Sequence, residues 1–260
     1  MMQLCREIRF ALTNNYSPTI SNSWSGWPST NQIAPNLRLQ CTIEGPVDEQ
    51  TGYICNIKEI DQLLRDSITQ KVIPDFTPGT HAESVLLQIH EFCDANWNSE
   101  ITIKKHTLVL SPCLRYSIQS SDPNMIELTQ QFEFSASHRL HCDHLSDEEN
   151  RAIFGKCNNI AGHGHNYVVE VSVCGTVGDD AGQVVPLHDF EAVVKAKVID
   201  VFDHKNLNED IKIFKTLNPS VENITKSIWD LLVDQFKDAK LNRIRVYETP
   251  KTWAEYSGTQ

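Results

Sequence analysis

The sequence repeats itself, and this internal duplication restricts the chain to two modules of one fold. Residues 37–47 with 52–64 are paralleled by residues 168–177 with 182–194, and residues 78–87 are paralleled by residues 218–226. The first pair predicts strand, turn, strand and helix, and the second pair predicts a helix that a strand follows. A short polar stretch near residues 120–124 joins the halves, so we predict one domain over residues 1–120 and another over 125–260.

Apolar periodicity predicts the secondary structure of the second module. Apolar residues recur on one face of two predicted helices, at positions 190, 193, 194, 198, 201 and 202 and at positions 221, 224, 228, 231 and 232. Alternation predicts strands over about 131–139, 163–174 and 243–248. Strands that pair as hairpins beside two helices indicate an α+β class with antiparallel sheets.

Two histidines follow closely behind a cysteine in the second module. Side chains two apart on a strand leave from the same face, so His163 and His165 can bind one ion together, six and eight residues after Cys157. A third ligand must come from another strand, and His138 shares a strand face with Phe134 and other apolar residues. Three imidazoles and an open fourth position describe a catalytic zinc site.

The alternative for this pair of histidines is a polar strand face without a metal, which is common for an unassisted His-x-His pattern. Gly162 and Gly164 favour the metal site, because glycine weakens a strand unless something must approach the backbone closely.

Glu248 lies where apolar side chains are expected. Alternation puts it on the same strand face as Ile244 and Val246. A buried carboxylate needs partners, which indicates a binding role, whereas the alternative is a tolerated charge at the end of a strand.

The composition excludes several classes of protein. The 260 residues carry a net charge of −11, which disfavours a nucleic-acid surface. We find neither a signal peptide nor an apolar run of membrane-spanning length, so we expect a cytoplasmic protein with a small-molecule partner and no contact with membranes. The eight cysteines contain no C-x-x-C pattern, so we expect mostly reduced side chains. Arg139, Arg151, Lys156 and Lys205 flank the motifs and could hold phosphates, although solvated surface cations are the simpler interpretation.

Six motifs of the second module resemble, in this order, those of the 6-pyruvoyl tetrahydropterin synthase family. They are Phe134-Ser-Ala-Ser-His-Arg-Leu140, Leu145-Ser-Asp-Glu-Glu-Asn150, Phe154-Gly-Lys-Cys-Asn-Asn159, Gly162-His-Gly-His-Asn-Tyr167, Asp203-His-Lys-Asn-Leu207 and Val246-Tyr-Glu-Thr249. The resemblance runs from about residue 130 to the C-terminus and implies two tandem T-fold modules. In this fold, antiparallel sheets with paired helices join edge to edge into a barrel across subunits, so we expect a homo-oligomer.

The resemblance also implies a zinc-dependent lyase that converts 7,8-dihydroneopterin triphosphate to 6-pyruvoyl tetrahydropterin with release of triphosphate. It implies that zinc is bound by His138, His163 and His165, that protons are moved by Cys157, Asp203 and His204, and that the pterin is anchored by Glu248. Two positions depart from the family's usual pattern: Val221 stands where a hydroxyl residue is common, and Pro186 where an asparagine is common.

Other functions remain open. The 6-carboxytetrahydropterin synthases of queuosine biosynthesis resemble this chain too, and they act on the same substrate with loss of acetaldehyde. The five residues between Cys157 and His163 resemble the pyruvoyl-forming pattern, but loop length does not decide which bond breaks. A folate branch that replaces the cysteine with glutamate is disfavoured. A non-catalytic duplicated scaffold would need a fourth ligand to close a structural zinc, from Cys157, His141 or His144.

The first module has none of these motifs. Residues 6–12 stand where the second module has the strand that ends at His138, and His81, His90 and His106 are isolated. An isolated histidine is more often a surface or core residue than a ligand. We therefore expect a degenerate module that completes the barrel, the alternative being that its face contributes to a binding pocket at the module interface.

Overall fold

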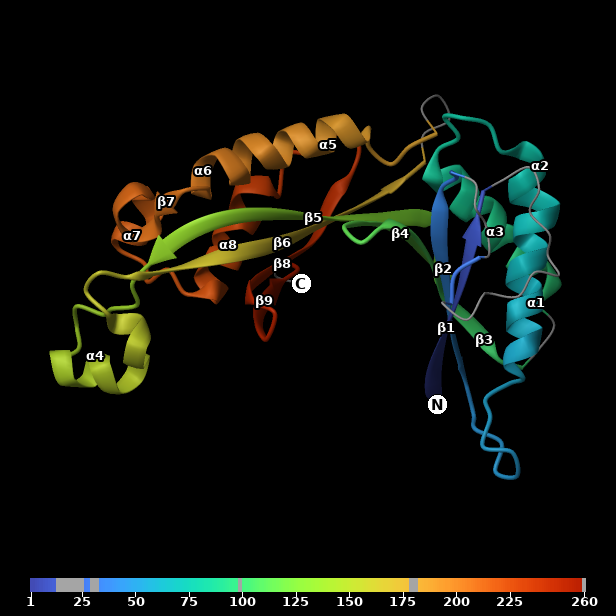
Figure 1. Ribbon diagram of the computed structural model, residues 1–260, viewed down its shortest axis with the longest axis horizontal. Coiled ribbons are helices and arrows are strands. Elements are labelled where there is room, and N and C mark those ends of the chain that lie inside the picture. The colour runs from blue at the N-terminus through green and yellow to red at the C-terminus, as the bar shows by residue number, and fades with distance from the viewer. Residues whose placement is uncertain (13–25, 29–32, 98–99, 178–181, 259–260) are drawn as a thin grey trace. The chain divides into compact units, whose positions relative to one another are not determined.

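The computed structural model describes residues 1–12, 26–28, 33–97, 100–177 and 182–258 (Figure 1). The chain divides into two compact units. The first comprises Met1–Leu128 with Gly175–Val184, and the second comprises Thr129–Cys174 with Val185–Gln260. Among the described helices, none combines the length and the apolar character needed to cross a membrane.

The first unit is an antiparallel sheet covered on one face by helices. Its elements in chain order are β1 (Met2–Ala11), β2 (Asn36–Gly45), α1 (Ile57–Ser67), the π-helical turn η1 (Ile68–Val72), α2 (Ile73–Asp75), α3 (Ala82–Asn96), β3 (Thr102–Ser111) and β4 (Leu114–Gln119). The strands pair in the order β1-β2-β3-β4. In β2 every second side chain, from Leu37 to Ile43, is buried, because alternate residues of a strand point to one face. Ile60 and Leu64 of α1 and Leu86 of α3 are fully buried and complete the core.

The second unit has the same order of principal elements. It contains β5 (Asp122–His138) from Thr129 on, α4 (Asp147–Phe154), the 3-10 turn η2 (Gly155–Asn158), β6 (His163–Thr176) up to Cys174, α5 (Leu187–Val194), the π-helical turn η3 (Lys195–Ile199), α6 (Asp200–Phe202), β7 (Lys205–Asn206), α7 (Leu207–Asp210), the 3-10 turn η4 (Lys212–Lys215), α8 (Val221–Leu232), β8 (Lys240–Thr249) and β9 (Thr252–Tyr256). Strands pair in the order β5-β6-β8-β9, and β7 adds a short parallel pairing to β5. The predicted antiparallel α+β class, strands and helices are thereby confirmed.

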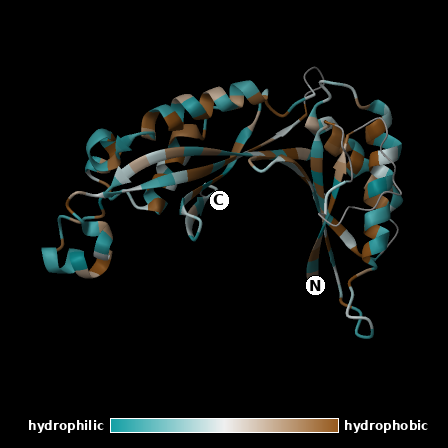
Figure 2. Ribbon diagram, viewed as in Figure 1, coloured by the Kyte–Doolittle hydropathy of each residue, from teal (hydrophilic) through white to brown (hydrophobic). Residues whose placement is uncertain are grey.

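The predicted apolar helix faces are also confirmed. Phe190, Val194, Val198 and Phe202 are buried, whereas Lys195 and Lys197 between them are exposed, and hydrophilic and hydrophobic residues alternate along this helix (Figure 2). The helix is not uniformly α-helical, since η3 separates α5 from α6. Ile224, on the predicted apolar face of α8, is fully buried.

A second strand was predicted directly before the first helix of each module, and this prediction was wrong. Residues 53–56 form a bend and residues 182–185 are bends as well. The amide of Gly52 donates to Asp48 O at 2.8 Å, and Gly52 has φ +72°, a left-handed conformation that ends extended structure. The β-branched residues in these segments favoured a strand locally, but none of the described strands pairs with them.

The strands that the structure describes are not closed into a barrel. β1 is an edge strand of the first unit, and β9 is an edge strand of the second. Unpaired strand edges expose backbone donors and acceptors that can pair with another chain.

The first unit buries a pair of histidines. Nδ1 of His90, on α3, lies 3.1 Å from Nδ1 of His106, on β3. His106 is fully buried, and its Nε2 has no hydrogen-bond partner among the described residues. Burial, together with the neighbouring His90, lowers the pKa of His106 to about 3.

Acid is therefore expected to destabilise the first unit. In the unfolded chain His106 regains an ordinary pKa near 6.5, so the unfolded state binds more protons between about pH 6.5 and pH 3. The free energy of unfolding should fall across this window by on the order of a few kcal/mol. Urea denaturation at several pH values measures it, and His106→Leu should show a shallower dependence than His144→Leu. Identical slopes in these two variants would contradict the prediction.

Candidate functional site

Three histidines come together in the second unit. His138 ends β5, and His163 and His165 begin the neighbouring strand β6. One ring nitrogen from each lies within 4.8 Å of those of the other two, and these are the only described residues that form such a group. Alternate side chains of a strand point to one face, which predicted that His163 and His165 lie together. The observed placement of the three histidines agrees with this rule.

The imidazole of His138 has a defined tautomer. Its Nδ1 lies 2.7 Å from the carbonyl oxygen of Pro219, which can only accept, so Nδ1 carries the proton. Its Nε2 is then the acceptor nitrogen and lies 3.2 Å from Nε2 of His163. Burial lowers the pKa of His138 to about 4, which keeps the ring neutral near pH 7. A neutral imidazole oriented through its second nitrogen is the usual form of a metal ligand.

The residues of the cluster fit a metal ion. Nε2 of His165 is buried without a hydrogen-bond partner among the described residues. Burial lowers the pKa of His165, although Glu248 opposes this shift. Two nitrogen ligands of a tetrahedral zinc stand roughly 3.4 Å apart, given bonds of about 2.0–2.1 Å, which is close to the observed His138–His163 spacing. The donor set of three imidazoles suits zinc and leaves a fourth position for an oxygen ligand.

Glu248 lies beside this cluster. It comes from β8, which pairs with β6, and its Oε1 is 3.5 Å from Nε2 of His138 and 3.8 Å from Nε2 of His165. The side chain is 19% exposed, as expected for a carboxylate on the buried face of a strand end. Glu248 can therefore accept hydrogen bonds from a ligand that enters the cluster.

Gly162 allows the backbone directly before β6 to approach the backbone of His138. It has φ +70°, and a Cβ atom there would lie 2.9 Å from the His138 carbonyl oxygen. Both features require glycine, because other L-residues are disfavoured at positive φ and the contact would involve rigid backbone.

Gly162→Ala is expected to destabilise the protein and weaken metal binding. Gly52→Ala is the matched control, since Gly52 has φ +72° and open space around it. The alanine at 162 should cost about 1–3 kcal/mol more than the alanine at 52, because it adds a steric clash to a similar backbone strain. Urea denaturation and the metal content of the purified variants measure both effects, and equal stability of the two variants would refute the role of Gly162.

Cys157 lies in the 3-10 turn η2, directly after α4. A capping box begins α4: Ser146 Oγ accepts from Glu149 N–H, and the Glu149 carboxylate accepts from Ser146 N–H. The Cys157 thiol is half-buried, and the Cys157 carbonyl accepts a 2.9 Å hydrogen bond from Leu140 N–H. This bond ties the loop of the thiol to the residues that follow His138.

Asp203 and His204 form a pair at the end of α6. Oδ1 of Asp203 accepts from Ser135 N–H at 2.9 Å, and Oδ2 lies 2.8 Å from Nδ1 of His204. The Ser135 amide, and next the His204 side chain, lower the pKa of Asp203. His204 has φ +56° and is 83% exposed. The carboxylate thus orients an imidazole whose Nε2 side faces solvent.

The structure brings some predicted site residues together and leaves others apart. His204 lines a cavity of about 450 Å³ that His165 also lines. Among the described residues, no hydrogen bond joins the Cys157 thiol to His204. Within one chain the cluster and Glu248 are therefore assembled, whereas the predicted relay between thiol and imidazole is not.

Two buried asparagines that organise the site were missed by the sequence analysis. The Asn150 side chain binds both the N–H and the carbonyl of Cys142 and holds the loop before α4. Nδ2 of Asn158 donates to Leu140 O at 2.8 Å and lies 3.0 Å from Nδ1 of His141. This contact occupies Nδ1 of His141, a candidate for a fourth ligand that lies outside the three-histidine group. The only signal in the sequence for a role of these asparagines was that both lie inside motifs that resemble those of the family.

The second unit is similar to known proteins. Residues 127–259 match the family described as 6-pyruvoyl tetrahydropterin synthase. A 6-pyruvoyl tetrahydrobiopterin synthase of Drosophila melanogaster is 40% identical over 132 residues, covering 50% of this chain and 79% of that protein. The Dictyostelium discoideum protein of the same name is 43% identical over 131 residues, covering 50% and 95%. A putative 6-carboxy-5,6,7,8-tetrahydropterin synthase of Archaeoglobus fulgidus is 38% identical over 100 residues, covering 38% and 77%.

Proposed function

Because the chain belongs to the 6-pyruvoyl tetrahydropterin synthase family, we propose that it is a zinc-dependent lyase acting on 7,8-dihydroneopterin triphosphate. The product is 6-pyruvoyl tetrahydropterin, and triphosphate is released. The observation that carries this proposal is the cluster of His138, His163 and His165, which offers three imidazole nitrogens at a spacing that suits zinc.

The three histidines would hold the metal, and His138 is pre-oriented by the Pro219 carbonyl. When bound, zinc supplies Lewis-acid polarisation of substrate oxygens, which acidifies a neighbouring C–H bond. The Glu248 carboxylate accepts hydrogen bonds from the amino and ring N–H groups of the pterin and so orients the ring. Its contacts with two of the imidazoles support a substrate position between the cluster and β8.

Proton movement is assigned to Cys157, Asp203 and His204. The Cys157 thiolate removes a proton from the substrate side chain, since the thiolate is the basic form. Asp203 orients the His204 ring through Nδ1, so that His204 can accept and return a proton at Nε2. We propose that a homo-oligomer, formed through the edge strands β1 and β9, completes the arrangement of thiol and imidazole and closes the barrel.

The first unit is proposed to be a duplicated T-fold module that has lost the chemistry. Both units have the principal order of two strands, two helices and two strands, and both pair their strands in the same order. Each unit also interrupts its first helix with a π-helical turn, η1 or η3. A shared irregularity of this kind supports duplication, because π-turns are rare.

Product identification tests the proposed function. The purified zinc-loaded protein is incubated with 7,8-dihydroneopterin triphosphate, and products are identified by mass spectrometry. Triphosphate with a pyruvoyl pterin is the expected result. Acetaldehyde with a carboxypterin would assign the chain to the alternative, 6-carboxytetrahydropterin synthase, which the likeness to the Archaeoglobus fulgidus protein keeps as second candidate. The absence of any turnover by metal-loaded protein would overturn both.

A further inference from the structure

Another cavity of the second unit has a positively charged lining. Its volume is about 510 Å³, and its charged lining residues are Arg139, Arg151, Lys156 and Asp147. Three cations and one carboxylate give the lining a net charge of 3 − 1 = +2. The whole chain has a net charge of −11, so this concentration of positive charge is local. A concave surface with excess positive charge attracts an anion.

The guanidinium of Arg139 is held in place within this cavity. Its Nε donates to Asn158 O at 3.0 Å, and its Nη2 lies 3.2 Å from Nδ1 of His141. Asn158 is itself only 9% exposed and is anchored to the Leu140 carbonyl. The other amino group, Nη1, makes no hydrogen bond with a described residue. A guanidinium that is oriented in advance loses less entropy when it binds an oxyanion.

The other two cations have no ion-pair partner in the described part of the chain. Arg151 lies on α4 and Lys156 on η2, and both side chains are exposed. Asp147, at the first residue of α4, makes no ion pair with them either. Arg139 lies in the segment that follows β5, and the contacts of Asn158 with Arg139 and Leu140 join this segment to η2, which carries Lys156.

Two residues that line the cavity are sequence neighbours of residues in the proposed reaction site. Arg139 directly follows the ligand candidate His138, and Lys156 directly precedes Cys157. Adjacent Cα atoms are about 3.8 Å apart, so a substrate held at the cluster could extend a charged tail toward these cations. The hydrogen bond from Leu140 N–H to Cys157 O joins the two segments.

We propose that this cavity binds the triphosphate tail of the substrate, with Arg139, Arg151 and Lys156 as its ligands. The inference rests on the proposed function for the identity of the substrate. Arginine binds phosphate oxygens through parallel N–H groups and lysine binds them as a point charge, so the set suits an extended polyanion.

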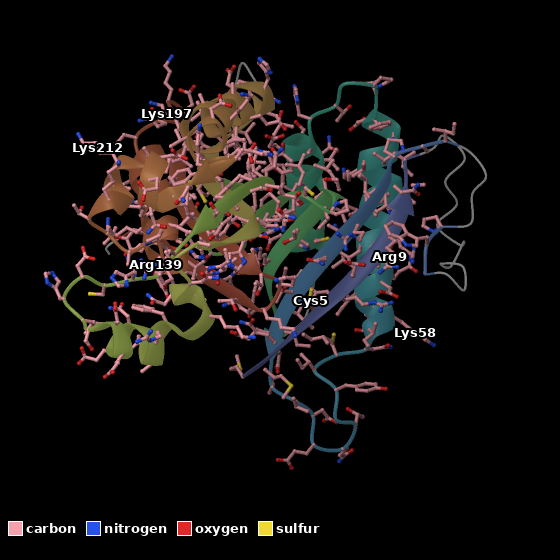
Figure 3. All side chains as sticks on the ribbon, turned by 60° about the vertical axis from the view of Figure 1, so that its left-hand side comes forward. Cys5, Arg9, Lys58, Arg139, Lys197 and Lys212 are labelled. Carbon is pink, nitrogen blue, oxygen red and sulfur yellow. The ribbon has the colours of Figure 1, made fainter. Side chains whose placement is uncertain are left out.

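Calorimetric titration with inorganic triphosphate tests the site independently of turnover. Wild type should bind the anion, and the double variant Arg151→Gln/Lys156→Gln should bind it at least about tenfold more weakly, since charge-assisted hydrogen bonds are lost. The matched control is Lys197→Gln/Lys212→Gln, which removes the same charge from exposed side chains that point away from Arg139 (Figure 3). This control should bind as wild type does. The His163→Ala variant should also retain binding, because the anion sits at the cations and not at the metal.

Several results would overturn the site: no binding by wild type, equal binding by the double variant and wild type, or loss of binding in His163→Ala. Conversion of dihydroneopterin triphosphate is measured separately. Normal anion binding without conversion would refute the proposed reaction and leave the anion site intact. Conversion with unchanged KM in the double variant would refute the anion site and leave the reaction intact.

Discussion

Replacing His163 with alanine is expected to remove the metal from the protein and to abolish conversion of dihydroneopterin triphosphate. His163 supplies one of three imidazoles, and two ligands cannot retain zinc as three do. Turnover should fall by more than about 100-fold, since loss of even an outer partner of a metal ligand commonly costs 10- to 100-fold. Elemental analysis of the purified protein and product formation measure the two effects.

His144→Ala is the control for this prediction. His144 is exposed and lies outside the three-histidine group. Its variant should keep both metal and activity. If His163→Ala retained a full complement of metal, the assignment of the cluster would be wrong. If it lost metal but kept full turnover, the metal would be structural and the scaffold alternative would gain support.

Replacing Cys157 with alanine is expected to lower turnover by about 10²- to 10⁴-fold while metal content and stability stay close to wild type. The side chain is half-buried in a turn that is held by backbone hydrogen bonds, so its removal should not disturb the fold. The loss follows from removal of the group that takes a proton from the substrate. Steady-state kinetics, with metal analysis on the same samples, separates this variant from His163→Ala.

Cys142→Ala provides a matched thiol control, because Cys142 is also half-buried and lies in the preceding loop. It should retain activity. Activity of Cys157→Ala at the wild-type rate would exclude the thiol as a base and would leave His204 as the alternative proton acceptor. Equal losses of activity in both cysteine variants would indicate that the substitutions disturb the loop, and would not support a role of the Cys157 thiol in proton transfer.

Much of the fold follows from local sequence patterns. The faces of the helix that begins at Leu187 and of α8 follow from apolar spacing, and His138 shares its strand face with Phe134, as alternation predicts. The capping box at Ser146 is likewise readable, because its two hydrogen bonds join residues three apart. The error at residues 52–56 has the same origin, since local strand preference cannot show that a pairing partner is missing.

The sequence by itself determined which residues can bind a metal and on which strand faces they lie, because side-chain alternation and the spacing of two histidines are local properties. Only the tertiary structure decided the contacts between distant parts of the chain. Pro219, 81 residues from His138, sets the tautomer of that imidazole, and Glu248 reaches the cluster from β8. The pairing of His90 with His106 was decided in the same way. Such contacts depend on how helices pack on a sheet, and no local period of the sequence encodes that packing.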